Sequence, residues 1–180
     1  MRTFAAFANG LERFTQWVNR IFVLIGSVLV AAMMLVTVRE VFVRYVLDDP
    51  SRWAMDGSRF ALVYVFFLAL APALESGHHV SVDLFDPLLP RAVRRYQQPA
   101  AYLLVLFFAA VLFYYVSAVT LEVFDTGEMT YSVVPVQLKY IYCIGPIGVG
   151  EFWLTALVGF IRACQGAPLL ARATETPSGA

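Results

Sequence analysis

Four long apolar blocks constrain what this chain can fold into more than any other feature. One of them, Ala100 to Leu121, contains no charged residue, and a helix needs about 20 apolar residues to cross a bilayer. The chain is 60% hydrophobic and 14% charged, whereas soluble domains average roughly half apolar and about a quarter charged. Because the apolar excess lies in blocks, the sequence predicts an integral membrane protein rather than a soluble domain with a large core.

We expect an all-α protein with four transmembrane helices and no second domain. The expected organisation is a cytoplasmic N-terminal segment at 1–20, a membrane domain at 21–162 and a flexible cytoplasmic tail at 163–180. The four spans are expected at about 21–47, 50–75, 99–121 and 136–161.

Prolines and glycines punctuate these spans. Pro50 suits the first helical position of the second span, and Pro99 starts the third. Pro146 predicts a bend in the last span, where Gly148 allows another helix backbone to approach closely.

A short amphipathic helix is expected between the second and third spans, at about residues 87–98. On a helix, Arg94 shares one face with Arg91, Arg95 and Gln98, and apolar side chains fall on another face. Such a helix suits the cytoplasmic headgroup level of a membrane.

The distribution of basic residues favours cytoplasmic N- and C-termini. This topology places eight of the 13 lysines and arginines inside and five outside, in the sense of the positive-inside rule. The formal net charge of the chain is zero, which gives no electrostatic support for a nucleic-acid partner.

Charged and aromatic residues gather around the start of the second span. Arg52, Asp56 and Arg59 form a stripe on one helical face, and Trp53 suits a membrane interface. Just before them, Glu40 and Arg44 stand four residues apart and can pair on the first helix. An anion site is one interpretation of the stripe; a solvated face with snorkelling arginines is the more ordinary one.

Few residues can carry chemistry. The adjacent His78 and His79 point about 100° apart on a helix and cannot both bind one metal, so no metal or cofactor is expected.

Glu151 lies near the middle of the last apolar block, where an ionisable group is costly. It is either a proton or ion site or, as we favour, one half of a structural pair with an arginine on this chain or a partner.

The sequence holds no phosphate loop, nucleophile triad or CxxC motif, and we expect no enzymatic activity.

A family resemblance is carried by three stretches, in order: VFVRYVLDDPSRWAMDGSRF, LALAPALESGHHVSVDLFDPLLPRAVRR and TYSVVPVQLKYIYCIGPIGVGEFWL. They resemble the small membrane subunit of the TRAP transporters (tripartite ATP-independent periplasmic transporters), the DctQ-like or Q subunit. The family's characteristic positions fall on Arg44, Trp53, Asp56, His79, Asp83, Pro90, Pro146 and Gly148. Asp56 is a departure, because the family usually has glutamate there, and Glu151 matches no family acid.

The resemblance implies a transport function. In that family a large membrane subunit (M type) moves the substrate, driven by a sodium gradient, and a periplasmic substrate-binding protein (P type) delivers it. The small subunit then acts as a non-catalytic scaffold in the bacterial inner membrane, without ion or substrate sites, and helps to dock the binding protein. The substrates are small organic acids. His79 and Asp83 would fix the exit from the second span into the surface helix.

Two alternatives remain open from the residues alone. One is a four-helix membrane protein that carries haem, another redox group or a quinone, for which absorbance of the purified protein is diagnostic. The other is a stand-alone small transporter, which predicts activity without a large partner.

Overall fold

The computed structural model describes residues 2–49, 51, 53–76, 91–132 and 135–165. The helices are α1 (Arg2–Val46), α2 (Ala54–Glu75), α3 (Arg91–Thr126), α4 (Leu138–Tyr142) and α5 (Ile144–Gln165). Four stretches are long and apolar enough to cross a membrane: Asn9–Val46, Ala54–Glu75, Gln98–Thr126 and Leu138–Cys164. The expectation of an all-α protein with four spans is therefore confirmed.

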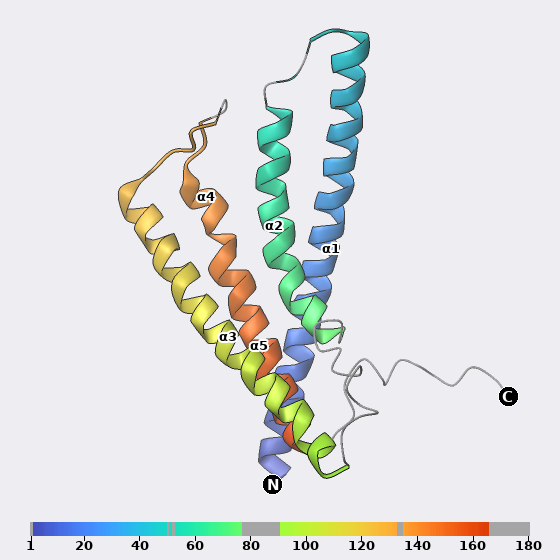
Figure 1. Cartoon of the computed structure of the whole chain (residues 1–180), viewed down its shortest axis with the longest axis vertical. Helices are drawn as coiled ribbons and strands as arrows, with labels where there is room; N and C mark the ends of the chain where they lie inside the picture. Colours follow the sequence, from blue (N-terminus) through green and yellow to red (C-terminus); the bar gives the residue numbers. More distant parts are fainter. Residues whose placement is uncertain (1, 50, 52, 77–90, 133–134, 166–180) are drawn as a thin grey trace, which may run out of the picture.

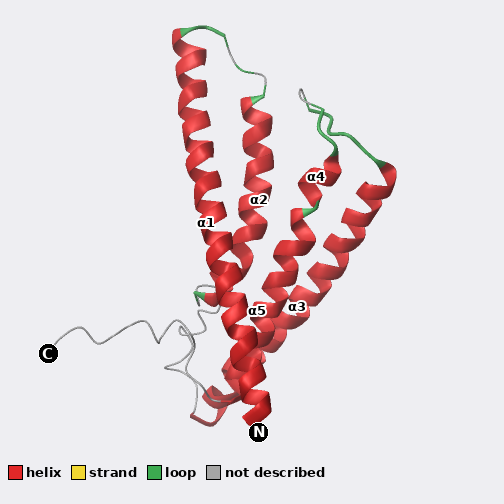
Figure 2. Cartoon of the chain, turned by 180° about the vertical axis from the view of Figure 1, so that it is seen from behind, coloured by secondary structure: helices red, strands yellow, loops and turns green. Residues whose placement is uncertain are grey.

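The helices form two arms that meet at one end of the molecule (Figure 1). One arm is the antiparallel pair of α1 and α2, and the other is α3 with α4 and α5. The arms converge at the end that holds the start of α1 and the end of α5, here called the closed end. They diverge toward the other end, the open end, as the view from behind also shows (Figure 2). Both the start of α1 and the end of α5 thus lie on the same side of the bundle.

Helix α5 joins the two arms because glycines let its neighbours come close. A Cβ atom on Gly148 would lie 2.5 Å from the backbone oxygen of Phe67 in α2. A Cβ on Gly159 would lie 2.3 Å from the ring of Tyr102 in α3. The close approach expected at Gly148 is present, and Gly159 provides a second one that the sequence analysis did not single out. The core beside these contacts consists of Ala71, Leu74, Tyr102, Ala109, Phe152 and Ala156.

The bend expected from Pro146 appears as the break between α4 and α5 at Cys143. Because proline has no N–H, it cannot donate to the carbonyl of Tyr142 four residues earlier. The hydroxyl of Thr120, on α3, donates to the carbonyl of Val116 in its own helix at 2.7 Å and lies 3.4 Å from the carbonyl oxygen of Tyr142. Tyr64 of α2 donates to the carbonyl of Tyr140, so α2 provides a hydrogen bond at the break.

The second span begins at Ala54, and the prediction that it starts at Pro50 was wrong. Pro50 itself lies outside the described residues. The backbone N–H of Ser51 donates to the Glu40 carboxylate at 2.9 Å, which fastens the connection to α1. Arg39 of α1 also donates to the Ser51 hydroxyl at 3.0 Å. These bonds tie Ser51, which lies outside the helix, to α1.

The prediction of a separate surface helix at 87–98 was wrong for the part that begins at Arg91. Residues 87–90 lie outside the described part. Arg91 to Gln98 form the first turns of α3, which continues through Pro99. Proline inside a helix removes one backbone hydrogen bond and either kinks or breaks the helix, and here the helix continues. The side chain of Arg94 is not described, so its interfacial role stays a prediction.

Gly148→Ala is expected to destabilise the protein by about 1–3 kcal/mol, because the added Cβ meets backbone rather than a movable side chain. Thermal unfolding of the purified protein in detergent measures the effect. Gly26→Ala is the matched control, since nothing lies within 4 Å of a Cβ there, and it should leave stability unchanged or raise it. Equal unfolding temperatures for Gly148→Ala and the wild type would contradict the close contact.

Candidate functional site

Polar side chains that are buried from solvent gather at the closed end, where α1, α2 and α5 meet. Of the seven buried polar or charged residues in the described part of the chain, five belong to this region, here called the polar joint: Glu12, Thr15, Asn19, Glu151 and Thr155. Polar groups buried in a membrane protein are costly unless they find partners within the protein. Their pairing therefore decides whether this region is a support or a reactive site.

Asn19 connects three helices by itself. Its side-chain Nδ2 donates to Glu75 Oε2 at 2.6 Å, and the same nitrogen lies 3.4 Å from Thr155 Oγ1. Asn19 is 2% exposed, so these bonds form away from water. A hydrogen bond to a charged group contributes about 1.5–3 kcal/mol. One amide thus holds the end of α2 and the middle of α5 against α1.

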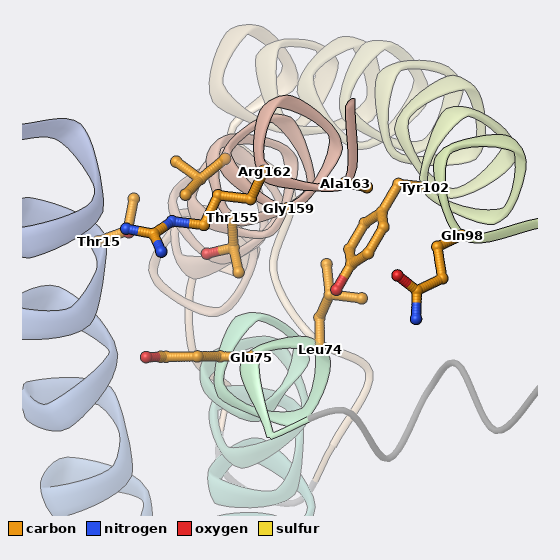
Figure 3. A pocket seen from close by; sticks show the side chains of 10 residues that line it. Thr15, Leu74, Glu75, Gln98, Tyr102, Thr155, Gly159, Arg162 and Ala163 are labelled. Atoms are coloured by element: carbon orange, nitrogen blue, oxygen red, sulfur yellow. The ribbon is translucent and has the colours of Figure 1, made fainter. Parts of the chain in front are cut away.

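An ion pair closes the joint on its outer side, where Arg162 of α5 donates to the carboxylate of Glu12 on α1. Figure 3 shows Arg162 extending from α5 toward α1, and Glu75 extending toward α1 from α2. The Glu12 side chain is 8% exposed and that of Arg162 is 29% exposed. The sequence analysis missed this pair because its members lie 150 residues apart.

The cavity beside the joint is small. Its volume is about 30 Å³, and Glu75, Tyr102, Thr155 and Arg162 are among the residues that line it (Figure 3). This is room for about one or two water molecules. A small organic acid does not fit this cavity, and the described contacts at the closed end hold the helices together.

Glu151 lies on α5, one turn before Thr155, and is 6% exposed. Its Oε1 atom is buried and has no hydrogen-bond partner within the described part of the chain. The carboxylate of Glu75 is close enough to interact with it electrostatically. Among the described residues no arginine pairs with Glu151, and Arg162 pairs with Glu12. The pairing of Glu151 with an arginine of a partner stays a prediction.

At the open end, the stripe of Asp56 and Arg59 forms only a loose contact. The nearest distance between the Arg59 guanidinium and the Asp56 carboxylate is 3.8 Å, and the Arg59 side chain is 70% exposed while that of Asp56 is 9% exposed. Arg44 is exposed and does not pair with Glu40, whose Oε1 accepts from Ser51 instead. The prediction of a Glu40–Arg44 pair was therefore wrong.

Trp53 sits at the start of α2, half-exposed, with the guanidinium carbon of Arg39 5.7 Å from its ring centroid. This contact places an aromatic ring and a cation together at the open end. His79 and Asp83 lie outside the described residues, so the roles expected for them stay predictions. Over the described ranges, no three His, Cys, Asp or Glu side chains come together in a way that could hold a metal ion.

Helix α1 presents a long apolar surface. In an 18-residue apolar stretch of the α1 span, no described residue is buried inside the protein. In the corresponding stretch of the α4–α5 span, 44% of the residues are buried. Leu24, Leu35 and Val38 are each about two-thirds exposed. The fold therefore places α5 at its centre and leaves α1 uncovered along the membrane.

These features define a multi-pass helical membrane protein whose buried polar groups fasten helices together. The sequence model of the "Tripartite ATP-independent periplasmic transporters, DctQ component" matches residues 33–166. The chain belongs to this family, and the resemblance inferred from its sequence is confirmed.

A named relative supports the same family. The chain is 29% identical over 84 residues to the "Sialic acid TRAP transporter small permease protein SiaQ" of Vibrio cholerae serotype O1, which is 47% of this chain and 49% of that protein. The chain thus matches about half the length of this relative.

Arg162→Met is expected to destabilise the protein by about 3 kcal/mol or more, because it leaves the buried Glu12 carboxylate without its cation. The double variant Glu12→Gln/Arg162→Met should recover much of that loss, since no charge then stays unpaired. Arg13→Met, on an exposed neighbour of Glu12, serves as the control in thermal unfolding. If the double variant were as unstable as the sum of the two single variants, the pairing would be refuted.

Proposed function

We propose that this chain is the small, non-catalytic scaffold subunit of a sodium-driven tripartite transporter for small organic acids. In this proposal it stabilises the large, elevator-type membrane subunit and helps to dock the periplasmic substrate-binding protein. The protein then lies in the bacterial inner membrane with both termini in the cytoplasm.

The uncovered apolar face of α1 is the observation that carries this proposal. The described part of the chain buries no residue of an 18-residue apolar stretch of α1, so this stretch is available to lipid or to a membrane partner. The closed end supports the same role, because the hydrogen bonds and the ion pair of the polar joint hold α1 against α2 and α5. A rigid joint and a long apolar face together suit a subunit that supports another.

The proposed orientation uses the positions of the basic residues. Arg13, Arg20 and Arg162 belong to the closed-end halves of their helices, and the start of α1 and the end of α5 lie together there (Figure 1). We assign this end to the cytoplasm, in line with the positive-inside rule. The open end then faces the periplasm and presents Trp53 and Arg59 to the binding protein.

Reconstitution tests the scaffold role directly. Vesicles that hold only this chain should accumulate no organic acid, whereas vesicles with the large subunit and the binding protein should do so under a sodium gradient. Omission of this chain should lower the yield of folded large subunit. Uptake by the isolated chain against a solute gradient would refute the proposal.

Glu151→Leu should leave the sodium dependence of uptake by the assembled transporter unchanged. The carboxylate is buried with an unpartnered Oε1, so an apolar residue of similar size is expected to leave stability equal or higher. Uptake is measured against sodium concentration, with co-purification as the control for assembly. A variant that assembles normally but has lost its sodium dependence would show that Glu151 is an ion or proton site.

A further inference from the structure

A second, larger cavity lies between the arms, on the open-end half of the molecule. Its volume is about 570 Å³. Phe60, Val63 and Phe67 of α2 form one wall, and Val116, Val119 and Ile141 contribute to the wall provided by α3 and α4. Phe60 and Phe67 are seven residues apart, so the cavity follows α2 for about 10 Å. It is therefore an elongated apolar groove within the membrane-spanning part of the chain.

A cation stands at the open-end limit of this groove. Arg59 lines the groove directly before Phe60 and lies about 8 Å from the start of α2. An arginine at this depth can extend its side chain to the headgroup level. Apart from its 3.8 Å approach to Asp56 and a 3.6 Å contact with the Met55 sulfur, no ionic or hydrogen-bond partner of Arg59 is recorded within the described residues. Since a guanidinium has five N–H donors, most of them remain available to a ligand.

The size of the groove limits its occupant. The groove follows α2 for only about 10 Å, which is about two turns of a helix. A partner helix that crosses the membrane needs a contact about 30 Å long, so the groove does not match a whole span. An unbranched hydrocarbon chain is far thinner and can follow the groove along its length.

We propose that this groove binds one phospholipid of the leaflet at the open end, with an acyl chain between α2 and the α3–α4 wall and the phosphate on Arg59. The apolar lining matches the chain, and the guanidinium matches a phosphate oxygen pair in charge and geometry. The lipid fills space that the diverging arms leave open, beside the hydrogen bond from Tyr64 of α2 to the carbonyl of Tyr140 in α4. This inference requires only that the chain spans a membrane, and it is independent of the scaffold role.

Native mass spectrometry of the full-length chain in detergent, titrated with dioleoylphosphatidylglycerol, tests the proposal. The wild type should show one saturable adduct. Val119→Trp should abolish the adduct, because Val119 lines the groove and is 42% exposed, so that the larger ring enters the groove rather than the core. Arg59→Ala should weaken the adduct about tenfold through loss of the charge-assisted hydrogen bond.

Arg44→Ala is the matched control, since Arg44 lines the groove between α1 and α2, which Arg59 also borders, but does not line the groove proposed for the lipid. Its affinity for the lipid should equal that of the wild type. Unchanged unfolding temperatures would confirm that Val119→Trp still folds. An adduct that survives Val119→Trp, or the absence of a saturable adduct in the wild type, would overturn the proposal. If the wild type bound no lipid and Val119→Trp prevented co-purification with the large subunit, the groove would belong to a protein partner.

Discussion

The hydrogen bond from Asn19 to Glu75 is the interaction on which the arrangement of the helices depends. In hydrocarbon, apolar side chains gain little by leaving lipid for one another, so close packing and polar contacts must decide which helices associate. Here the amide of Asn19 draws α1 to the end of α2 and to Thr155 of α5. Gly148 then lets α5 approach the backbone of α2 at Phe67. The closed end is consequently specified by two complementary devices, and the arms diverge beyond them.

The spans are the part of the fold that the sequence predicts well, and the reason is physical. A helix that crosses lipid must form its backbone hydrogen bonds internally and present apolar side chains. A continuous apolar block such as Ala100 to Leu121 therefore predicts a span without knowledge of the rest of the fold. The bends and starts are less local. Pro50 looks like a helix start by residue type, yet α2 begins at Ala54, and Ser51 is tied to Glu40 and Arg39 of α1. Pro99 looks like a boundary, but α3 continues through it.

The polar joint was largely hidden from sequence reasoning. Glu151 stands out because it interrupts an apolar block, whereas Glu12 and Arg162 lie near the ends of their helices and look like ordinary solvated residues. Their pairing depends on how α1 crosses α5, which no local pattern encodes. Asn19 shows the same limit, since an asparagine before an apolar run is unremarkable until Glu75 and Thr155 surround it. Gly148 was easier to recognise, because a glycine within an apolar span indicates a close helix approach by residue type alone.

The unpartnered oxygen of Glu151 indicates where the joint is not optimal. The amide of Asn19 has two donors and one acceptor, and while its nitrogen serves Glu75 and Thr155, its own Oδ1 stays buried without a partner, as does Glu151 Oε1. Both orphan atoms are acceptors, so a carboxyl proton on Glu151 would convert one of them into a donor, whereas a second carboxylate beside Glu75 would add repulsion. A neutral Glu151 is therefore compatible with a supporting joint. By the same logic, a leucine in its place removes an acceptor without leaving any described donor unpaired.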